Sequence, residues 1–132
     1  MIYALDANIV SYFLKEDEQV RHNTDTALEE GHELIIPRIV DYEVQRGLVA
    51  KDMTRKLKTY LDFCKCLDIG TIDDEVWQRA VYVYAELKKK GKMIGDGDIL
   101  IAAFCLVNDC TLVTYNTKHF ANIDGLKYVN WR

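Results

Sequence analysis

Short apolar runs alternate with longer segments of helical periodicity along the whole chain, and this alternation restricts the fold more than any other feature. The run at 2–5 is too short for a helix and is followed, after Asp6-Ala-Asn8, by an apolar stretch at 9–14, which predicts a strand, a turn and a helix. Further strands are expected at 33–36, 67–69, 111–114 and 126–131, and further helices at 16–31, 38–49, 51–66, 73–90 and 98–108. This order predicts an α/β fold with a short, mainly parallel sheet covered by helices on both faces.

The chain is expected to form a single domain over residues 1–132, since no internal repeat or linker divides it. No apolar run approaches the ~18 residues that a membrane span needs, and the N-terminus lacks the basic start and long apolar centre of a secretory signal. We therefore expect a soluble protein in the cytoplasm. The four cysteines form no Cys-x-x-Cys pair and are expected to be reduced packing residues, namely Cys64, Cys66, Cys105 and Cys110.

The formal net charge of −4 argues against a protein that coats nucleic acid without specificity, because such binding depends on Lys and Arg neutralising phosphates. The lysines at 88–90 and 92 are interpreted as the solvated end of a helix, with phosphate steering as the alternative. In that helix, the core stripe is expected to consist of Trp77, Val81, Tyr84 and Ala85.

Asp96 and Asp98 lie in the sequence Gly-Asp-Gly-Asp at 95–98, immediately before a long apolar run. We expect a loop entering a helix, with Asp96 near the N-cap and Asp98 in the first turn. The residues that share the helical face of Asp98 are small and apolar, namely Ile101, Ala102 and Cys105. An acid that points inward requires a metal ion or a hydrogen-bond network to compensate its burial. An acid that only complements the helix dipole requires neither, and this second role is favoured for Asp96.

Other polar residues can approach Asp98 in such a fold. Asp6 ends the first strand, where open α/β sheets place their ligands, although helix capping by Asp6 or Asn8 is the simpler interpretation. Glu43 lies on a mostly apolar helical stripe, and an inward placement competes with an ion pair to Arg46. Asn116 follows the strand at 111–114 as Asp6 follows the first strand. Two other polar residues are given no role in the site. Asp41 points elsewhere, and His119 is expected to be a packed or hydrogen-bonded loop residue.

Three carboxylates and an amide around one cleft suit a hard cation, Mg²⁺ or Mn²⁺, which keeps several waters and accepts phosphate oxygens as further ligands. Such an ion can lower the pKa of a bound water and offset charge on a leaving oxygen, and two ions about 3.5–4 Å apart would divide these tasks. The expected substrate is a phosphate ester, with the acids as metal holders rather than nucleophiles.

At these residues the chain resembles the PIN-domain ribonucleases and, more narrowly, the VapC-type toxins of bacterial toxin–antitoxin pairs. The motifs are Leu-Asp-Ala-Asn around Asp6, Tyr-Glu-Val-Gln-Arg-Gly around Glu43, Asp-Ile-Leu-Ile-Ala-Ala from Asp98, and Leu-Val-Thr-Tyr-Asn-Thr-Lys-His-Phe at 112–120. The resemblance covers essentially the whole chain. It implies a PIN-like three-layer fold and a metal-dependent endoribonuclease that cleaves RNA phosphodiester bonds.

The resemblance also implies roles for individual residues. Asp6, Glu43 and Asp98 match the core acidic residues of the family, which are catalytic and hold one or two Mg²⁺ or Mn²⁺ ions. Asn116 falls where some members carry a fourth acid, so a second ion is expected to bind more weakly, and Asp96 is an additional candidate ligand that could compensate. Thr114 resembles the family's small polar residue near the site, and Thr114 and Asn116 are expected to contact water or substrate.

Toxins of this type form homodimers and are held inactive by a cognate antitoxin whose C-terminal segment covers the cleft, where an Arg or Lys could replace the charge of the metal. No membrane partner is implied. Two alternatives remain at this stage. One is a non-catalytic PIN-like module that binds RNA or protein. The other is a receiver-type domain in which Asp6 accepts phosphate and Glu43 and Asp98 have no role.

Overall fold

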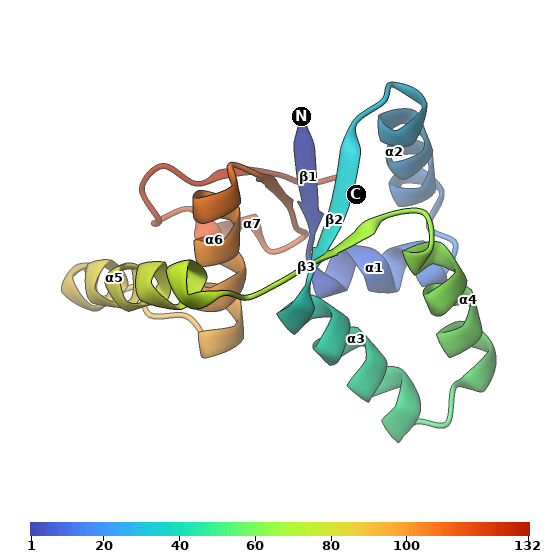
Figure 1. The fold of residues 1–132 in the computed structure, drawn as a ribbon, viewed down its shortest axis with the longest axis horizontal. Coiled ribbons are helices and arrows are strands. Elements are labelled where there is room, and N and C mark those ends of the chain that lie inside the picture. Colours follow the sequence, from blue (N-terminus) through green and yellow to red (C-terminus); the bar gives the residue numbers. More distant parts are fainter.

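A single five-stranded sheet forms the centre of the computed structural model, which describes residues 1–132. All neighbouring strands are parallel, in the order β3-β2-β1-β4-β5 (Figure 1). The strand bounds are β1 Ile2–Leu5, β2 Glu33–Pro37, β3 Asp68–Gly70, β4 Thr111–Val113 and β5 Lys127–Val129. The predicted α/β architecture is confirmed, and every predicted strand is present.

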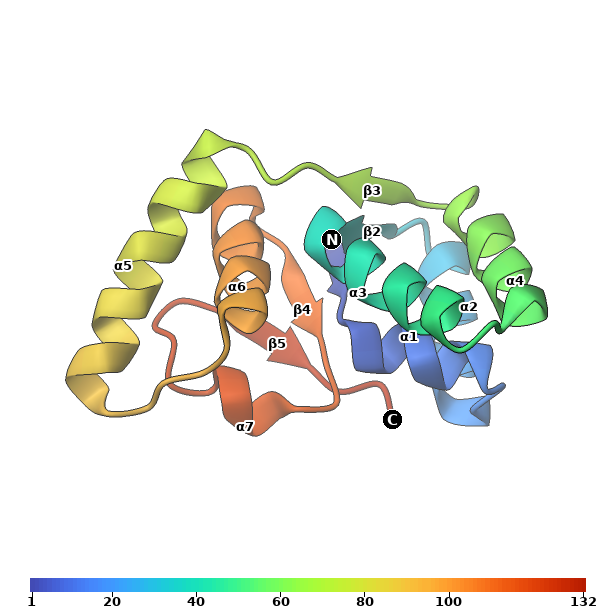
Figure 2. The ribbon, with the colours of Figure 1, turned by 90° about the horizontal axis from the view of Figure 1, so that it is seen from below.

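Seven helices flank the sheet. Their bounds are α1 Ala7–Leu14, α2 Glu18–Glu29, α3 Arg38–Ala50, α4 Thr54–Cys64, α5 Asp74–Lys90, α6 Asp96–Asn108 and α7 Thr117–Phe120. Figure 2 shows them in two groups, with α1 to α4 at one side of the sheet and α5 packed on α6 at the other. Only α7, a single turn after β4, lies where the sequence indicated a loop. None of the helices is both long enough and apolar enough to cross a membrane.

The hydrophobic core surrounds α6 and the central strands β1 and β4. Residues 99–105 of α6 are all buried, so this helix is covered on every side rather than along one stripe. It reaches across to the edge strand, where a Cβ at Gly70 would overlap the ring of Phe104. Burial of α6 fixes the position of its first turn, which carries Asp98.

The expected core stripe of α5 is wrong. Trp77, Val81 and Tyr84 are 54%, 58% and 45% exposed. The residues that α5 buries are instead Val76, Ala80, Val83 and Leu87. Both sets have helical spacing, and packing against α6 selects between them. An exposed aromatic and apolar stripe therefore runs along the outer face of α5.

The caps of α5 fix its ends close to the predicted bounds of 73–90. The Asp73 carboxylate accepts a hydrogen bond from the Val76 backbone N–H at 3.0 Å, and Gly91 ends the helix with φ of 64°. Lys90 forms ion pairs with Glu86 and Asp124 at 2.7 and 3.1 Å. This pairing supports the interpretation of the lysine run as a helix end.

Candidate active site

Asp6 is fixed at the point where β1 becomes α1. Its backbone N–H donates to the Val113 carbonyl at 2.9 Å and so extends the pairing of β1 with β4. Its Oδ1 accepts from the Ala7 N–H at 2.8 Å and caps α1. The side chain is 5% exposed. The capping interpretation is therefore confirmed, and it places one oxygen of Asp6 while leaving Oδ2 to other partners.

Thr114 holds that second oxygen. Its hydroxyl donates to Asp6 Oδ2 at 2.7 Å and accepts from the Asn116 backbone N–H at 3.0 Å. Thr114 is completely buried. The expected direct contact of Thr114 with water or substrate is therefore corrected: its side chain is shielded from the open site and acts on Asp6.

Asn8 is a supporting residue to which the sequence assigned only a capping role. Its amide nitrogen lies 3.4 Å from Asp6 Oδ2, and its Oδ1 accepts from the Tyr115 N–H at 3.1 Å. Asn8 thereby ties the start of α1 to the loop after β4. Its position two residues after an acid at a strand end was the only signal in the sequence, and that signal is shared with ordinary helix caps.

Glu43 points inward from α3. Its Oε1 is the only buried side-chain nitrogen or oxygen in the chain without a hydrogen-bond partner. A Cβ on Gly97 would lie 3.8 Å from each of its carboxylate oxygens, which places the Glu43 carboxylate against the first turn of α6. The alternative ion pair does not form, because the Arg46 guanidinium lies over the ring of Tyr42, 5.0 Å from its centroid.

Asp98 lies in the first turn of α6 with its side chain 29% exposed. Its Oδ2 is 3.3 Å from Nδ1 of His119, so His119 is hydrogen-bonded as predicted and the partner is an acidic site residue. Asp96 and Asn116 are exposed, and neither side chain forms a hydrogen bond. Asp96 lies next to the N-cap residue Gly95, in the first turn of α6, as predicted, although its side chain forms no capping hydrogen bond.

Asp6, Glu43 and Asp98, here called the acidic trio, affect one another electrostatically. Burial raises the pKa of Glu43, and the charges of Asp6 and Asp98 raise it further. Burial also raises the pKa of Asp6; the Thr114 hydrogen bond and the Ala7 N–H oppose this increase, while Asp98 adds to it. No Lys or Arg forms an ion pair with any of the three. Arg46 opposes the increase for Glu43 without forming an ion pair with it. The topology therefore gathers three acids from the end of β1, from α3 and from α6 with no Lys or Arg ion pair among them.

The donor chemistry of the trio fits a hard divalent cation. All three side chains offer carboxylate oxygens, and the buried, unpartnered Oε1 of Glu43 is the kind of atom that a bound ion or water satisfies. No group of three or more Asp, Glu, His or Cys side chains is close enough to form a ready ligand cage. Mg²⁺ is compatible with such an open set of acids, because it binds through one or two carboxylates and keeps several waters.

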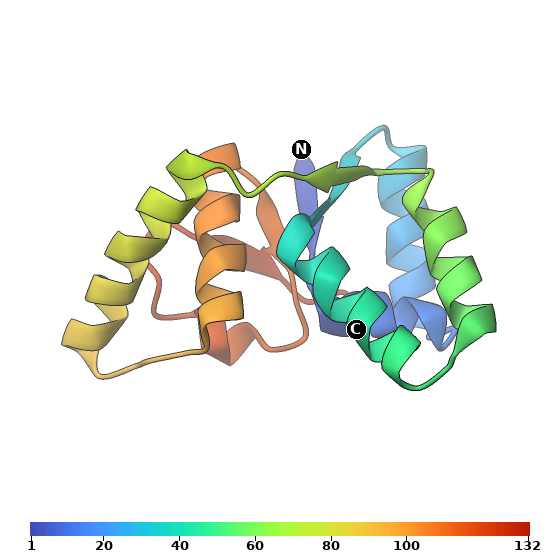
Figure 3. The same cartoon turned by 60° about the horizontal axis from the view of Figure 1, so that its bottom comes forward.

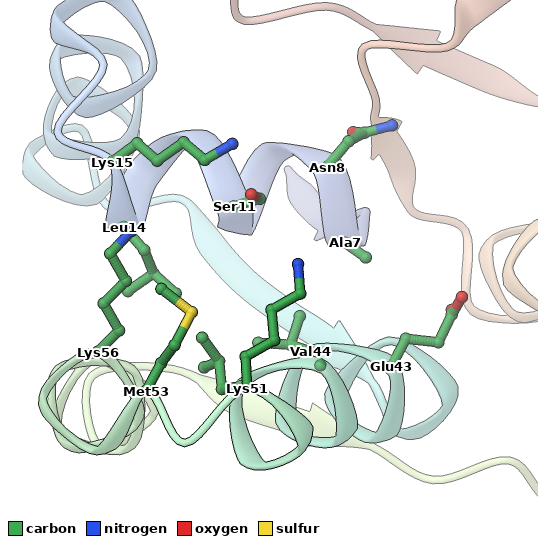
Figure 4. A pocket seen from close by; sticks show the side chains of 12 residues that line it. Ala7, Asn8, Ser11, Leu14, Lys15, Glu43, Val44, Lys51, Met53 and Lys56 are labelled. Atoms are coloured by element: carbon green, nitrogen blue, oxygen red, sulfur yellow. The ribbon is translucent and has the colours of Figure 1, made fainter.

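A groove of about 370 Å³ begins beside Glu43 and runs between α1 and α3 (Figure 4). Asn8 and Glu43 lie at the end nearest the trio, and Ser11 lines the α1 wall. Three lysines also line the groove, and none of them forms an ion pair: Lys15, Lys51 and Lys56. This groove therefore brings three lysines toward the Glu43 end of the trio, in addition to the lysine run at the end of α5 that the sequence analysis interpreted as a solvated helix end.

The chain is similar to characterised proteins over nearly its full length. The PIN domain model matches residues 3–126. Ribonuclease VapC2 of Rickettsia felis is 33% identical over 132 residues, covering 99% of this chain and 98% of that protein. A crystal structure of VapBC2 from Rickettsia felis bound to a promoter DNA fragment has a TM-score of 0.93 and 30% identity, covering 100% of both chains. DNA-bound VapBC from Salmonella typhimurium has a TM-score of 0.89 and 23% identity, covering 100% of this chain and 99% of that one.

Proposed function

We propose that this chain, which belongs to the PIN domain family and to its VapC ribonucleases, is a metal-dependent endoribonuclease. Its active site in this proposal is the acidic trio. The observation that carries the proposal is the unpartnered, buried carboxylate oxygen of Glu43, which lies within the electrostatic influence of Asp6 and Asp98. Three neighbouring acids repel one another and do not stabilise the fold. The same three acids can bind a cation, and that cation can bind a phosphodiester.

The proposed metal ligands differ in how firmly the chain fixes their positions. Asp6 is positioned by the Ala7 N–H and the Thr114 hydroxyl, so its free lone pairs have a fixed direction. Glu43 and Asp98 bring acceptors from two helices, and we propose Asp96 and Asn116 as further ligands on the exposed side. A bound Mg²⁺ or Mn²⁺ would offset the charge of the trio and lower the pKa of a coordinated water, with one or two ions taking part.

No protein nucleophile is needed in this proposal. Water attacks phosphorus and loses a proton to solvent, the bond from phosphorus to the leaving oxygen breaks, and that oxygen takes up a proton from solvent. Asp6, Glu43 and Asp98 would hold the cation through their carboxylate oxygens and form no covalent bond to phosphorus. Burial and mutual repulsion raise the pKa of Asp6 and of Glu43, and a bound cation would favour their ionised forms. The proposed RNA substrate places the activity in the cytoplasm.

We further propose that the chain is the toxin of a toxin–antitoxin pair. Solved relatives are VapBC complexes, and an Arg or Lys side chain from an antitoxin could neutralise the acidic trio in place of the metal. We also propose a homodimer in which a second copy covers the exposed stripe of Trp77, Val81 and Tyr84 on α5. Trp77→Ser should then shift the mass measured by light scattering from dimer to monomer.

A non-catalytic PIN-like module that binds RNA or protein is the second candidate. One observation favours it: the trio does not form a closed ligand cage. Metal titration separates the two functions. If the chain is the nuclease, Mn²⁺ should raise its unfolding temperature. At a hundredfold excess of Mn²⁺ over Kd, the free energy of unfolding should rise by about 2.7 kcal/mol, and Asp98→Asn should abolish this increase.

The decisive experiment is cleavage of total cellular RNA by the purified chain, free of antitoxin, with Mg²⁺ or Mn²⁺, with EDTA, and with Asp98→Asn. We expect cutting that requires the metal and that Asp98→Asn reduces by about a thousandfold, a loss of several kcal/mol of transition-state stabilisation. Asp109→Asn is the matched control, since this exposed acid pairs only with Lys127. Metal-independent cutting, or equal activity of the two variants, would contradict the proposal.

A further inference from the structure

A stripe of polar, aromatic and cationic side chains leads away from Asp6 along α1. Asn8, Tyr12 and Lys15 are four and three residues apart, so they share one helical face. Figure 4 shows Asn8 and Lys15 projecting from the same side of α1. This face begins at the residue that contacts Asp6 and ends at an ammonium group without an ion pair.

Two residues from the C-terminal part of the chain extend this face. The Tyr115 ring lies 5.4 Å from the ring of Tyr12. The Arg132 guanidinium lies over both rings, 4.3 Å from the centroid of Tyr12 and 5.6 Å from that of Tyr115, and the Lys15 ammonium lies 5.9 Å from the Tyr12 centroid. Two aromatic rings and two cations therefore form one surface, here called the aromatic platform.

The aromatic platform adjoins the acidic trio. The Tyr115 N–H donates to Asn8, and Tyr115 directly follows Thr114, whose hydroxyl holds Asp6. Tyr115 is nevertheless 43% exposed. The ring is accordingly fixed at its backbone and open on its outer side, beside the site where a phosphodiester would be cleaved.

A purely structural role explains only part of the aromatic platform. Arg132 pairs with Asp17 at 3.0 Å, and the Trp131 carbonyl accepts from Asn23, so these contacts do anchor the last residues of the chain. They give no reason for Tyr115 to remain exposed or for Lys15 to remain without an acidic partner. Single-stranded RNA offers partners for both residues. Its bases stack on aromatic rings and guanidinium planes, and its phosphates bind cations.

We propose that the aromatic platform binds the RNA strand next to the scissile phosphate, with one nucleobase stacked on Tyr115 and backbone phosphates on Lys15 and Arg132. This inference rests on the proposed function, since it takes RNA as the substrate of the neighbouring trio. It assigns to Tyr115 the stacking of the flanking nucleobase, whatever its identity. A protein partner on the same surface is an outcome that the test distinguishes.

The test measures binding of a labelled single-stranded RNA of about twelve nucleotides by fluorescence anisotropy with Mg²⁺, using Asp98→Asn as the uncleaving parent. Adding Tyr115→Leu should weaken binding by about tenfold, and Tyr115→Trp should restore it because an aromatic face returns. Tyr82→Leu is the matched control, a 65% exposed tyrosine on α5. Lys15→Gln and Arg132→Gln should each reduce the slope of log K against log salt by about 0.7.

The outcomes separate this inference from the proposed function. Equal binding by Tyr115→Leu and its parent, or equal weakening by Leu and Trp, overturns the inference even if the wild-type chain cleaves RNA. Binding that depends on Tyr115 in a chain that never cleaves supports the inference and refutes the nuclease. Absence of any RNA binding by the parent overturns the inference, whereas the proposed function is decided by cleavage with the wild-type chain.

Discussion

Two acids on α3, Asp41 and Glu43, are two residues apart and have opposite surroundings. Asp41 is 5% exposed and accepts hydrogen bonds from the Tyr60 hydroxyl at 2.8 Å, the Gln45 amide at 2.9 Å and the Arg38 guanidinium at 2.9 Å. Burial opposes the ionisation of Asp41, yet these three donors together leave its pKa below the ordinary value.

Glu43 has no such donors. Its Oε1 is buried without a partner, and burial together with Asp6 and Asp98 raises its pKa. The comparison teaches that burial alone does not mark a functional acid. A buried carboxylate whose lone pairs are satisfied within the chain stabilises the fold, whereas one whose lone pairs are free is available to a ligand from outside.

Of the two acids on α3, Glu43 should have the larger effect on activity when it is changed to Gln. We expect kcat/KM for RNA cleavage to fall about a hundredfold or more, because the amide offers the metal no charge. Unfolding in EDTA should occur at the same or a higher temperature, since one repelling charge is gone. A clear loss of thermal stability would show that Glu43 is a structural acid like Asp41.

Asp41→Ala should have the reverse effect. The Tyr60 hydroxyl is left buried without its acceptor, so the free energy of unfolding should fall by about 2 kcal/mol. Activity per folded molecule should change by less than about twofold. Urea unfolding measures the first quantity and cleavage at matched folded concentration the second, with Tyr60→Phe as the control that removes the same bond from its other end.

Thr114→Val tests whether hydrogen bonding within the chain also prepares the active site. The isosteric change removes the hydroxyl that donates to Asp6, so we expect activity to fall about tenfold with at most ~1 kcal/mol of stability lost. Thr114→Ser should retain most of the activity because the hydroxyl remains. Full activity in the valine variant would show that Ala7 and the fold hold Asp6 without help.

The pH dependence of metal-free stability should differ in sign between the two acids of α3. Glu43 has a raised pKa, so its favourable contribution is present below its ordinary value of 4.5 and is lost as the pH rises through the raised value. Asp41 has a lowered pKa, so its contribution is present above 3.8 and is lost as the pH falls through the lowered value.

From about pH 3 to pH 7 in EDTA, the wild-type chain should therefore lose stability relative to Glu43→Gln and gain stability relative to Asp41→Asn. Urea midpoints of the three proteins across this range measure both slopes. Slopes of the same sign would refute the contrast between the two acids. Added Mn²⁺ should remove only the slope assigned to Glu43.

Local patterns in the sequence predicted the strands, the main helices and the convergence of Asp6, Glu43 and Asp98, because each depends on residues near in the chain and on the ordering of parallel strands. The inward placement of Glu43 could not be separated from an ion pair with Arg46, since that choice depends on the ring of Tyr42. The catalytic roles remain predictions.

Contacts between distant segments account for what the sequence missed. The buried face of α5 is selected by α6, although both of its faces show helical spacing. The buried orientation of Thr114 and the approach of Tyr115 and Arg132 to Tyr12 depend on side chains that lie over a hundred residues apart in the chain. No periodicity within one segment reports such contacts.

The hydrogen bond between Thr114 and Asp6 joins residues separated by 108 positions. Asp6 is therefore synthesised well before the residue that holds it. During synthesis at about 5–20 residues per second, roughly 5–20 s pass between the addition of Asp6 and that of Thr114. In Figure 3 the sheet is seen to be completed by β4 and β5, the last strands to be made. Until Thr114 has been added, a nascent chain lacks the hydroxyl that holds Oδ2 of Asp6, so the candidate site stays incomplete over that interval.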